Sequence, residues 1–316
     1  MWREKQAELL NEIEVVLASI ANTPGLHDLT KEILAKIQGG LLVASTVYRP
    51  WSLLPLIVCE TICGKYKHAL PAAAGLQLLR ASAEVFDDVE DADSSTSLSA
   101  KYGSAIAINV ATSLLILAER ALTRLKLNCI DDCTIIRVID TINSHYTVAC
   151  AGQHLDLSLK TGTTISEDVY FNVIEMKSAS TLECSCRVGA LLARANQQLT
   201  DTFGQFGHNL GIAAQIADDI LDITEKNNFV GCKLTLPIIY ALAQTRGQKR
   251  RQLKQALLQS YTAASKSDKI REILFSSGAI QYATIKMELY KQLALDNLFS
   301  IRKEVSCAEQ LKQFLE

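Results

Sequence analysis

Residues 82–91, SAEVFDDVED, and residues 210–222, LGIAAQIADDILD, decide how this sequence is interpreted. Each stretch ends in the pattern Asp-Asp-x-x-Asp and lies in a segment whose apolar residues recur with helical spacing. On a helix, positions i and i+4 share a face and position i+1 lies beside it, so three carboxylates would project the same way from each helix. One such cluster could be a solvated helix end. Two clusters of the same form in apolar helices favour a functional role.

Closely spaced carboxylates repel one another and resist burial unless a cation joins them. Mg²⁺ accepts hard oxygen ligands, keeps several water positions and commonly completes its shell with substrate phosphate. Metal charge of this kind stabilises a departing diphosphate, so that a carbon–oxygen bond can break and leave an allylic cation. The two clusters therefore predict Mg²⁺-assisted ionisation of a diphosphate.

The rest of the chain is also patterned as helices. Only 15 of its 316 residues are Gly and 5 are Pro, and no alternating apolar and polar block or hairpin signal occurs. Helices are predicted over residues 5–20, 28–38, 52–63, 69–91, 101–126, 131–157, 166–195, 198–224, 233–245, 248–260, 268–303 with a break near Gly278, and 306–315. Because no linker or repeat interrupts them, we expect one all-α domain over residues 1–316, a large helical bundle around a central cavity.

The composition limits the possible classes of protein. Hydrophobic residues make up 48% and charged residues 21%, and 34 acidic residues nearly balance 32 basic ones. A net charge of −2 does not suggest nucleic acid as a partner. The charged start, MWREK, is not a signal peptide, and the longest uncharged stretch, 102–118, is interpreted as a buried helix because it is short for a transmembrane segment. We therefore expect a soluble, cytoplasmic protein.

The chain has nine cysteines. Cys59 and Cys63, and likewise Cys129 and Cys133, are four residues apart, which places each pair on one face of a helix. Neither pair has the Cys-x-x-Cys form, and the sequence shows no histidine partner for either. Buried free thiols in a reducing compartment are therefore the preferred interpretation over a metal site.

Further segments agree with the two clusters: residues 69–74, ALPAAA; 152–156, GQHLD; 176–178, MKS; and 233–242, KLTLPIIYAL. With them, the chain resembles the trans-isoprenyl (polyprenyl) diphosphate synthase family of class I isoprenoid synthases from about residue 40 to about residue 245. This resemblance implies the class I isoprenoid synthase fold, a homodimer, and an allylic prenyl diphosphate substrate bound together with three Mg²⁺ ions.

The resemblance also implies roles for individual residues. The metal ligands would be Asp87, Asp88, Asp91, Asp218, Asp219 and Asp222. Lys177, as part of the catalytic set, and Lys233 would contact the allylic diphosphate as point charges, although either could instead be a solvated surface residue. Gln153 and Gln215 would line the cavity near the reacting carbon, unless their role is structural hydrogen bonding.

The departures from the family concern the acceptor. Elongating synthases carry Gly-Gly-Lys-Arg-x-Arg-Pro, which binds the diphosphate of isopentenyl diphosphate, whereas residues 45–50 here read STVYRP and keep only Arg49. They also carry Arg-Arg-Gly after the first Asp motif, but residues 93–101 contain no arginine. Each missing charge-assisted contact is worth about 1.5–3 kcal/mol, so isopentenyl diphosphate should bind poorly.

Several readings of this departure remain open, and the acceptor is unknown. The first is a prenyltransferase with another acceptor, similar to the ComQ-type pheromone isoprenyl transferases, which share the short link, Gly-Gln-His at 152–154 and stretches like 277–282 and 290–292. The second is a terpene cyclase, and the third is a non-catalytic partner subunit. An elongating synthase with a rebuilt acceptor site would need replacement charge from Lys65, Lys67 or Lys101.

The residues before the first Asp motif concern the prenyl tail. Ser82 and Ala83 lie five and four residues before Asp87, one helical turn deeper in the bundle. In the family, bulky residues there stop the growing chain. Two small residues therefore predict a tail of fifteen to twenty carbons or longer, unless they serve only to pack helices together.

Overall fold

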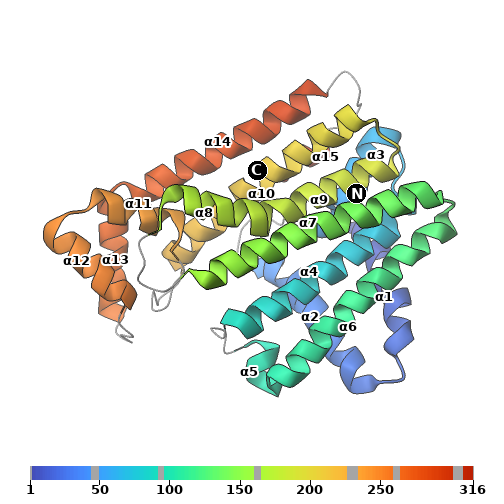
Figure 1. Ribbon diagram of the computed structural model, residues 1–316, viewed down its shortest axis with the longest axis horizontal. Helices are drawn as coiled ribbons and strands as arrows, with labels where there is room; N and C mark the ends of the chain where they lie inside the picture. Colours follow the sequence, from blue (N-terminus) through green and yellow to red (C-terminus); the bar gives the residue numbers. More distant parts are fainter. Residues whose placement is uncertain are drawn as a thin grey trace. The chain divides into compact units, whose positions relative to one another are not determined.

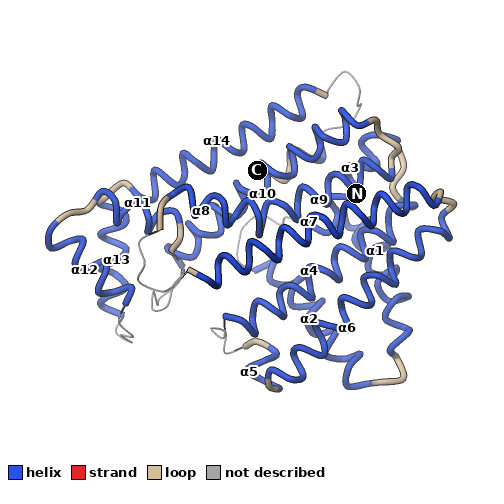
Figure 2. The backbone as a smooth tube through the Cα atoms, viewed as in Figure 1, coloured by secondary structure: helices blue, strands red, loops and turns tan. Residues whose placement is uncertain are grey.

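A computed structural model gives the structure of the protein for residues 2–43, 50–91, 96–159, 165–225, 234–258, 264–301 and 309–315. Over these ranges the chain consists of helices and connecting loops, without a strand, as Figure 2 shows. The prediction of an all-α protein is confirmed.

The helices agree closely with the spacing of apolar residues. They are α1 (Trp2–Leu17), α2 (Pro24–Val43), α3 (Leu54–Cys63), α4 (Leu70–Asp91), α5 (Leu98–Tyr102), α6 (Ser104–Thr123), α7 (Asp132–Ser158), α8 (Glu167–Ile174), α9 (Ser180–Leu192), α10 (Gln197–Glu225), α11 (Leu236–Gln244), α12 (Gly247–Leu258), α13 (Ala264–Ser276), α14 (Ala279–Ser300) and α15 (Glu309–Lys312). Short 3-10 turns cover Ala18–Ile20, Trp51–Leu53, Lys67–Ala69 and Arg124–Asn128.

Two local differences from the prediction stand out. The helix expected over residues 166–195 is interrupted, because a π-helical turn, Glu175–Ala179, separates α8 from α9. The short helix α5, capped by the Ser97 hydroxyl, was not expected in the link after the first Asp motif. The break predicted near Gly278 is confirmed, since that residue separates α13 from α14 with a φ of 76°.

Internal contacts divide the chain into two units. Unit 1 comprises Met1–Ser144, Cys184–Gly204 and Ser300–Glu316, and unit 2 comprises His145–Glu183 and Gln205–Phe299. The expected single domain over residues 1–316 stays a prediction.

In unit 1, α4 packs along α6, and the two helices lie side by side in Figure 1. Small residues make this possible: Ala72, Ala73 and Ala74 of α4 and Ala111 and Ala118 of α6 are all fully buried. Small side chains allow two helix backbones to approach closely over several turns. The first Asp motif occupies the last turns of α4, so this interface fixes its position within unit 1.

Residues Ser104–Asn128, which include α6, form one helical run long and apolar enough to cross a membrane by length and composition. One face of α6 carries the buried residues that pack within unit 1. We therefore interpret it as a core helix, in line with the buried helix expected from the sequence.

Unit 2 has two adjoining hydrophobic clusters. The first joins α11, α12 and α13 through residues such as Ile238, Leu253 and Leu274. The second joins α8, α10 and α11 through Tyr170 of α8, Ile216 of α10, and both Leu236 and Ile239 of α11. Asp219 lies on α10 in the same turn as Ile216, so the second Asp motif is built directly onto this core.

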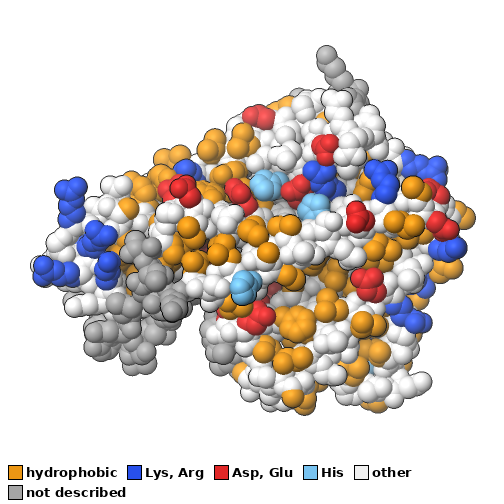
Figure 3. Space-filling view, in the orientation of Figure 1, with side chains coloured by type: hydrophobic (Ala, Val, Ile, Leu, Met, Phe, Trp, Pro, Cys, Tyr) orange, Lys and Arg blue, Asp and Glu red, His pale blue; other side chains and the backbone are white. Residues whose placement is uncertain are grey.

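Basic side chains gather over α12 in Figure 3, at the left of the view. They belong to the run at residues 246–254, whose basic members are Arg246, Lys249, Arg250, Arg251 and Lys254. The net charge did not point to this run, because acidic residues elsewhere in the chain balance its basic ones.

Candidate active site

The first Asp motif ends α4 in unit 1. Asp87 and Asp91 are partly exposed and share a helix face, because they are four residues apart. The side chain of Asp88 is 17% exposed, and its Oδ2 lies 3.2 Å from Nζ of Lys36 on α2. Asp88 is therefore engaged by a basic side chain of the protein, and like Asp87 and Asp91 it is partly exposed.

The two small residues before this motif have different surroundings. Ser82 is fully buried, and its hydroxyl donates a hydrogen bond of 2.9 Å to the carbonyl of Ala111 on α6. Ser82 therefore packs α4 against α6, which favours the packing alternative, and its role in lining the prenyl pocket stays a prediction. Ala83 is exposed and shares its face with Asp87, so of the two it is the one that suits a tail-lining position.

The second Asp motif has a buried middle member. Asp219 is 6% exposed, and three groups of unit 2 donate to its carboxylate: Tyr170 Oη at 2.7 Å, Gln215 Nε2 at 3.1 Å and the backbone N–H of Leu236 at 3.4 Å. Burial raises the pKa of Asp219 to about 6, even though these three hydrogen bonds act in the opposite direction. Asp219 therefore ties α8, α10 and α11 together.

The flanking aspartates of the second motif are more accessible. Asp218 is exposed and Asp222 is partly exposed. In both motifs the middle aspartate contacts other protein groups, Lys36 in the first and Tyr170, Gln215 and Leu236 in the second. The role of the six aspartates as metal ligands stays a prediction.

Lys177 lies in the π-helical turn, and its Nζ is 3.4 Å from Oδ2 of Asp156 on α7. Two glycines allow this turn to sit close to its neighbours. A Cβ at Gly152 would lie 2.7 Å from the backbone nitrogen of Lys177, and a Cβ at Gly211 would lie 2.5 Å from Cα of Ala179. Such π-helical turns occur frequently at functional sites, where they change the direction of a side chain. The Gly-Gln-His-Leu-Asp motif therefore supports Lys177 from α7.

The two glutamines of the predicted site, Gln153 and Gln215, have different surroundings. Gln215 accepts a hydrogen bond of 2.7 Å from the Ser178 hydroxyl and donates one to Asp219, so it links the π-helical turn to the second motif. This supports the structural alternative for Gln215. Gln153 is partly exposed on α7, next to Gly152, and its role near the reacting carbon stays a prediction.

Thr235 caps the start of α11 beside Asp219. Its backbone has the extended conformation of an N-cap residue, but its side chain makes no capping hydrogen bond. The hydroxyl is buried and has no hydrogen-bond partner in the part of the chain that the structure describes. A buried hydroxyl without a hydrogen-bond partner suits a site at which a polar ligand binds. Lys233, two residues earlier, and Arg49 lie outside the described residues.

Aromatic residues of α14 support α8, the helix that carries Tyr170. Tyr282 donates a hydrogen bond of 2.7 Å to the carboxylate of Glu167, and the rings of Tyr290 and Phe171 are 5.8 Å apart. Phe171 in turn meets Tyr170 edge-on, with ring centroids 5.4 Å apart. The stretches 277–282 and 290–292 thus contribute to the surroundings of the second motif.

Two of the three basic residues considered as replacements in the acceptor site, Lys67 and Lys101, have other partners. Lys67 lies 2.6 Å from Glu8, and Lys101 lies 2.6 Å from Glu32, both on the surface of unit 1. Lys67 also precedes α4, whereas the Asp motif ends it. These pairs do not support a rebuilt site for the diphosphate of isopentenyl diphosphate.

The residues of both motifs suit Mg²⁺. They offer carboxylate oxygens, which are the hard ligands that this ion prefers, and they offer few enough of them to leave water and phosphate positions. The sequence missed Lys36 and Tyr170, because each is about fifty positions from its aspartate along the chain and no local pattern connects them. Thr235 could have been found, since the motif at 233–237 contains it.

The chain matches the polyprenyl synthetase family over residues 48–274. It is 26% identical over 279 residues to the geranylgeranyl diphosphate synthase of Saccharolobus solfataricus, covering 83% of each chain. It is 30% identical over 254 residues to the tryptophan prenyltransferase ComQ of Bacillus subtilis subsp. natto, covering 77% of this chain and 72% of that one. A crystal structure of a geranylgeranyl pyrophosphate synthase shares the fold, with a TM-score of 0.84 at 21% identity, and the match covers 100% of this chain and 97% of that one.

Proposed function

The chain belongs to the polyprenyl synthetase family and is a prenyltransferase, and we propose that it transfers an allylic prenyl group of about fifteen to twenty carbons to an acceptor other than isopentenyl diphosphate. The observation that carries this proposal is the loss of the acceptor-binding basic residues, of which only Arg49 remains in the segment 45–50. The similarity to a tryptophan prenyltransferase supports it and suggests an indole side chain as the acceptor.

In the proposed reaction, Asp87 and Asp91, together with Asp218 and Asp222, would hold Mg²⁺, and the bound metal would supply positive charge that stabilises the leaving diphosphate. Lys177 adds a further charge for the phosphate oxygens, and Asp156 keeps that ammonium group in place. Asp219 and Gln215 fix the geometry of α10 relative to α8 and the π-helical turn.

The covalent change is a substitution at the allylic carbon. The carbon–oxygen bond of the prenyl diphosphate breaks, and the electron pair leaves with the diphosphate. An electron pair of the indole ring then forms a new carbon–carbon bond, and the ring carbon loses its proton. Neither an oxidant nor a reductant is needed.

Product analysis tests the acceptor. The purified protein, Mg²⁺ and farnesyl or geranylgeranyl diphosphate would be incubated with isopentenyl diphosphate, with a tryptophan-containing peptide, or alone. We expect a prenylated peptide. We do not expect a prenyl diphosphate with a longer carbon chain than the substrate. A longer diphosphate formed only with isopentenyl diphosphate would establish an elongating synthase, as the geranylgeranyl diphosphate synthase relatives suggest. A hydrocarbon formed without any acceptor would establish a cyclase.

We also assign the protein to the cytoplasm and propose that it is a homodimer, as the family resemblance implies. On α6, the exposed residues Ile108, Leu115 and Ile116 lie on one face, seven and eight positions apart. An exposed apolar face of this kind suits contact with a second copy. Light scattering should give twice the mass of one chain, and the mass of a single chain would contradict the proposal.

A further inference from the structure

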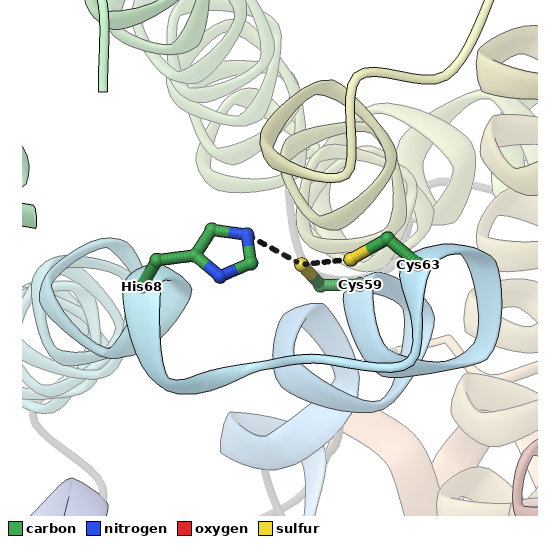
Figure 4. A group of neighbouring side chains, drawn as sticks. All are labelled: Cys59, Cys63 and His68. Carbon is green, nitrogen blue, oxygen red and sulfur yellow. Dashed lines mark hydrogen bonds between the residues drawn. The ribbon is translucent and has the colours of Figure 1, made fainter. Parts of the chain in front are cut away.

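A second group of ligand-type side chains lies in unit 1, at the end of α3. Cys59 and Cys63 occupy one face of this helix, and their sulfur atoms are 4.0 Å apart. Nε2 of His68, in the 3-10 turn before α4, is 3.3 Å from Sγ of Cys59. The three donor atoms all lie within 4.8 Å of one another, and Figure 4 shows the Cys59 sulfur between the His68 ring nitrogen and the Cys63 sulfur. Cys59 and Cys63 therefore have a histidine neighbour that their sequence spacing did not predict.

The chain reversal after α3 brings the histidine to the cysteines. Gly64 ends the helix with a φ of 72°, a conformation that side chains with a Cβ rarely adopt. Residues 64–66 then turn back, and the 3-10 turn Lys67–Ala69 places His68 against the last turn of α3. Two short elements thus position the three residues, of which Cys59 and His68 are only nine positions apart in the chain.

The separations match a tetrahedral metal site. With metal–sulfur bonds of about 2.3 Å and metal–nitrogen bonds of about 2.05 Å, tetrahedral angles place two sulfur ligands about 3.8 Å apart and a sulfur and a nitrogen ligand about 3.5 Å apart. The observed distances of 4.0 Å and 3.3 Å differ from these values by only about 0.2 Å. The third pair, Sγ of Cys63 and Nε2 of His68, lies within 4.8 Å, so side-chain rotations that shorten this distance by at most about 1.3 Å complete the bound geometry.

We propose that Cys59, Cys63 and His68 bind one thiophilic divalent cation of the Zn²⁺ class. Two thiolates and an imidazole are ligands that Zn²⁺ accepts in tetrahedral sites. Cys59 is buried, while Cys63 is exposed and His68 partly exposed, so the cation can enter from the Cys63 side. Water completes the fourth position.

Binding exchanges protons for the metal. Burial raises the pKa of the Cys59 thiol, so the metal-free thiol is protonated. The Cys63 thiol donates to the carbonyl of Lys65 at 3.3 Å, and His68 Nε2 lies 3.2 Å from the carbonyl of Leu192. Metal binding releases one proton from each thiol, and it requires the imidazole to carry its remaining proton on Nδ1.

This site is separate from the Asp motif of the same unit. His68 immediately precedes α4, which begins at Leu70, whereas Asp87 lies 17 residues further along that helix. At a rise of 1.5 Å per residue, Leu70 and Asp87 are about 26 Å apart along α4. A cation bound here would tie α3 to the start of α4 and stabilise that end of unit 1.

Co²⁺ is the probe for the first test, because its bonds to thiolates give an intense charge-transfer absorption that carboxylate ligands do not. The full-length protein, reduced and freed of metal with a chelator, would be titrated with Co²⁺ and then with Zn²⁺. We expect one Co²⁺ per chain with this absorption, and its loss when Zn²⁺ displaces Co²⁺. Absence of the absorption from the wild-type protein would overturn the proposal.

Variants assign the site. Cys63→Ser and His68→Ala should each lower the affinity for Co²⁺ at least tenfold. Cys133→Ser is the matched control, because Cys129 and Cys133 have the same spacing and both are exposed, without a histidine in such a group among the described residues. This control should bind as the wild type does. Binding that survives Cys63→Ser but is lost in Cys133→Ser would refute the assignment.

Thermal unfolding gives an independent readout. Zn²⁺ should raise the melting temperature of the wild-type protein and of Cys133→Ser, because a ligand that binds only the folded state stabilises it. It should leave that of Cys63→Ser unchanged. Circular dichroism would check that each variant keeps its helices. An equal shift in Cys63→Ser would show that the stabilising ion binds elsewhere.

Discussion

At the scale of single residues, the middle aspartate of each motif is held by contacts with other protein groups. Asp88 faces Lys36, and Asp219 is enclosed by Tyr170, Gln215 and the start of α11. The sequence could predict that these positions carry acids, but it could not predict these contacts, because Lys36 and Tyr170 are distant from the motifs in the chain.

Asp219 should affect the stability of the metal-free protein in a pH-dependent way. Its pKa is about 6 in the folded state and 3.8 without the fold. Between these values the folded state holds more protons than the unfolded chain, so the free energy of unfolding should fall as the pH rises, by on the order of 2–3 kcal/mol. Denaturant unfolding in the presence of a chelator measures this slope.

Two variants at neighbouring positions make this test specific. Asp219→Asn should remove most of the slope between about pH 4 and about pH 6, because the amide does not titrate. Asp218→Asn, at the exposed neighbouring position, should retain it. The same slope in both variants would show that another group is responsible.

Thr235 should contribute to substrate binding rather than to folding. Its buried hydroxyl has no partner in the described part of the chain, so the similarly shaped Thr235→Val variant should be as stable as the wild type or more stable. Loss of a hydrogen bond to the bound diphosphate or its water should raise KM about tenfold. Steady-state kinetics measures the change in KM, and thermal unfolding measures the stability of the variant. An unchanged KM would place the hydroxyl outside the site.

Ala83 should set the length of the prenyl tail. Ala83→Phe places a large ring on the face of α4 that carries Asp87, one turn deeper, so it should shorten the longest accepted diphosphate by about one isoprene unit. Competition between farnesyl and geranylgeranyl diphosphate measures the change. Ser82→Phe should instead destabilise the fold, since Ser82 is fully buried against α6. An Ala83→Phe enzyme with the original preference would contradict the assignment.

At the scale of elements, the π-helical turn is the feature that sequence periodicity missed. A helix over 166–195 was expected, and one extra residue per turn at Glu175–Ala179 does not disturb the apolar pattern enough to be seen. The glycines that accommodate it, Gly152 and Gly211, are visible in the sequence, but their partners are not. Helix positions were otherwise predictable, because burial of one face imposes a period that the sequence must carry.

Gly152→Ala should disturb this turn. The new Cβ would lie 2.7 Å from the backbone nitrogen of Lys177, so either α7 or the turn must shift. We expect destabilisation by about 1–3 kcal/mol and a loss of kcat that exceeds the change in KM, because Lys177 would move. Gly25→Ala is the control, since a Cβ there has no neighbour within 4 Å. Wild-type stability and activity in Gly152→Ala would refute the close approach.

At the scale of the whole molecule, the order of the motifs along the chain was enough to predict the family and the fold. The two-unit division was not predictable, because its four boundaries fall within the helices α7, α9, α10 and α14. The group formed by Cys59, Cys63 and His68 was also missed, because it depends on a chain reversal at Gly64 that periodicity does not describe. The proposal of an acceptor other than isopentenyl diphosphate rests on missing basic residues, and their loss was visible in the sequence.

The most direct test of the central claim measures diphosphate release from farnesyl or geranylgeranyl diphosphate with Mg²⁺, in the presence of both isopentenyl diphosphate and a tryptophan peptide. This readout does not depend on which acceptor is used. We predict that Asp87→Ala and Asp218→Ala each reduce release by about a hundredfold or more, while Asp28→Ala, an exposed carboxylate on α2, leaves it unchanged. Release at the wild-type rate in either motif variant would contradict the assignment of both aspartate motifs to one metal-assisted ionisation.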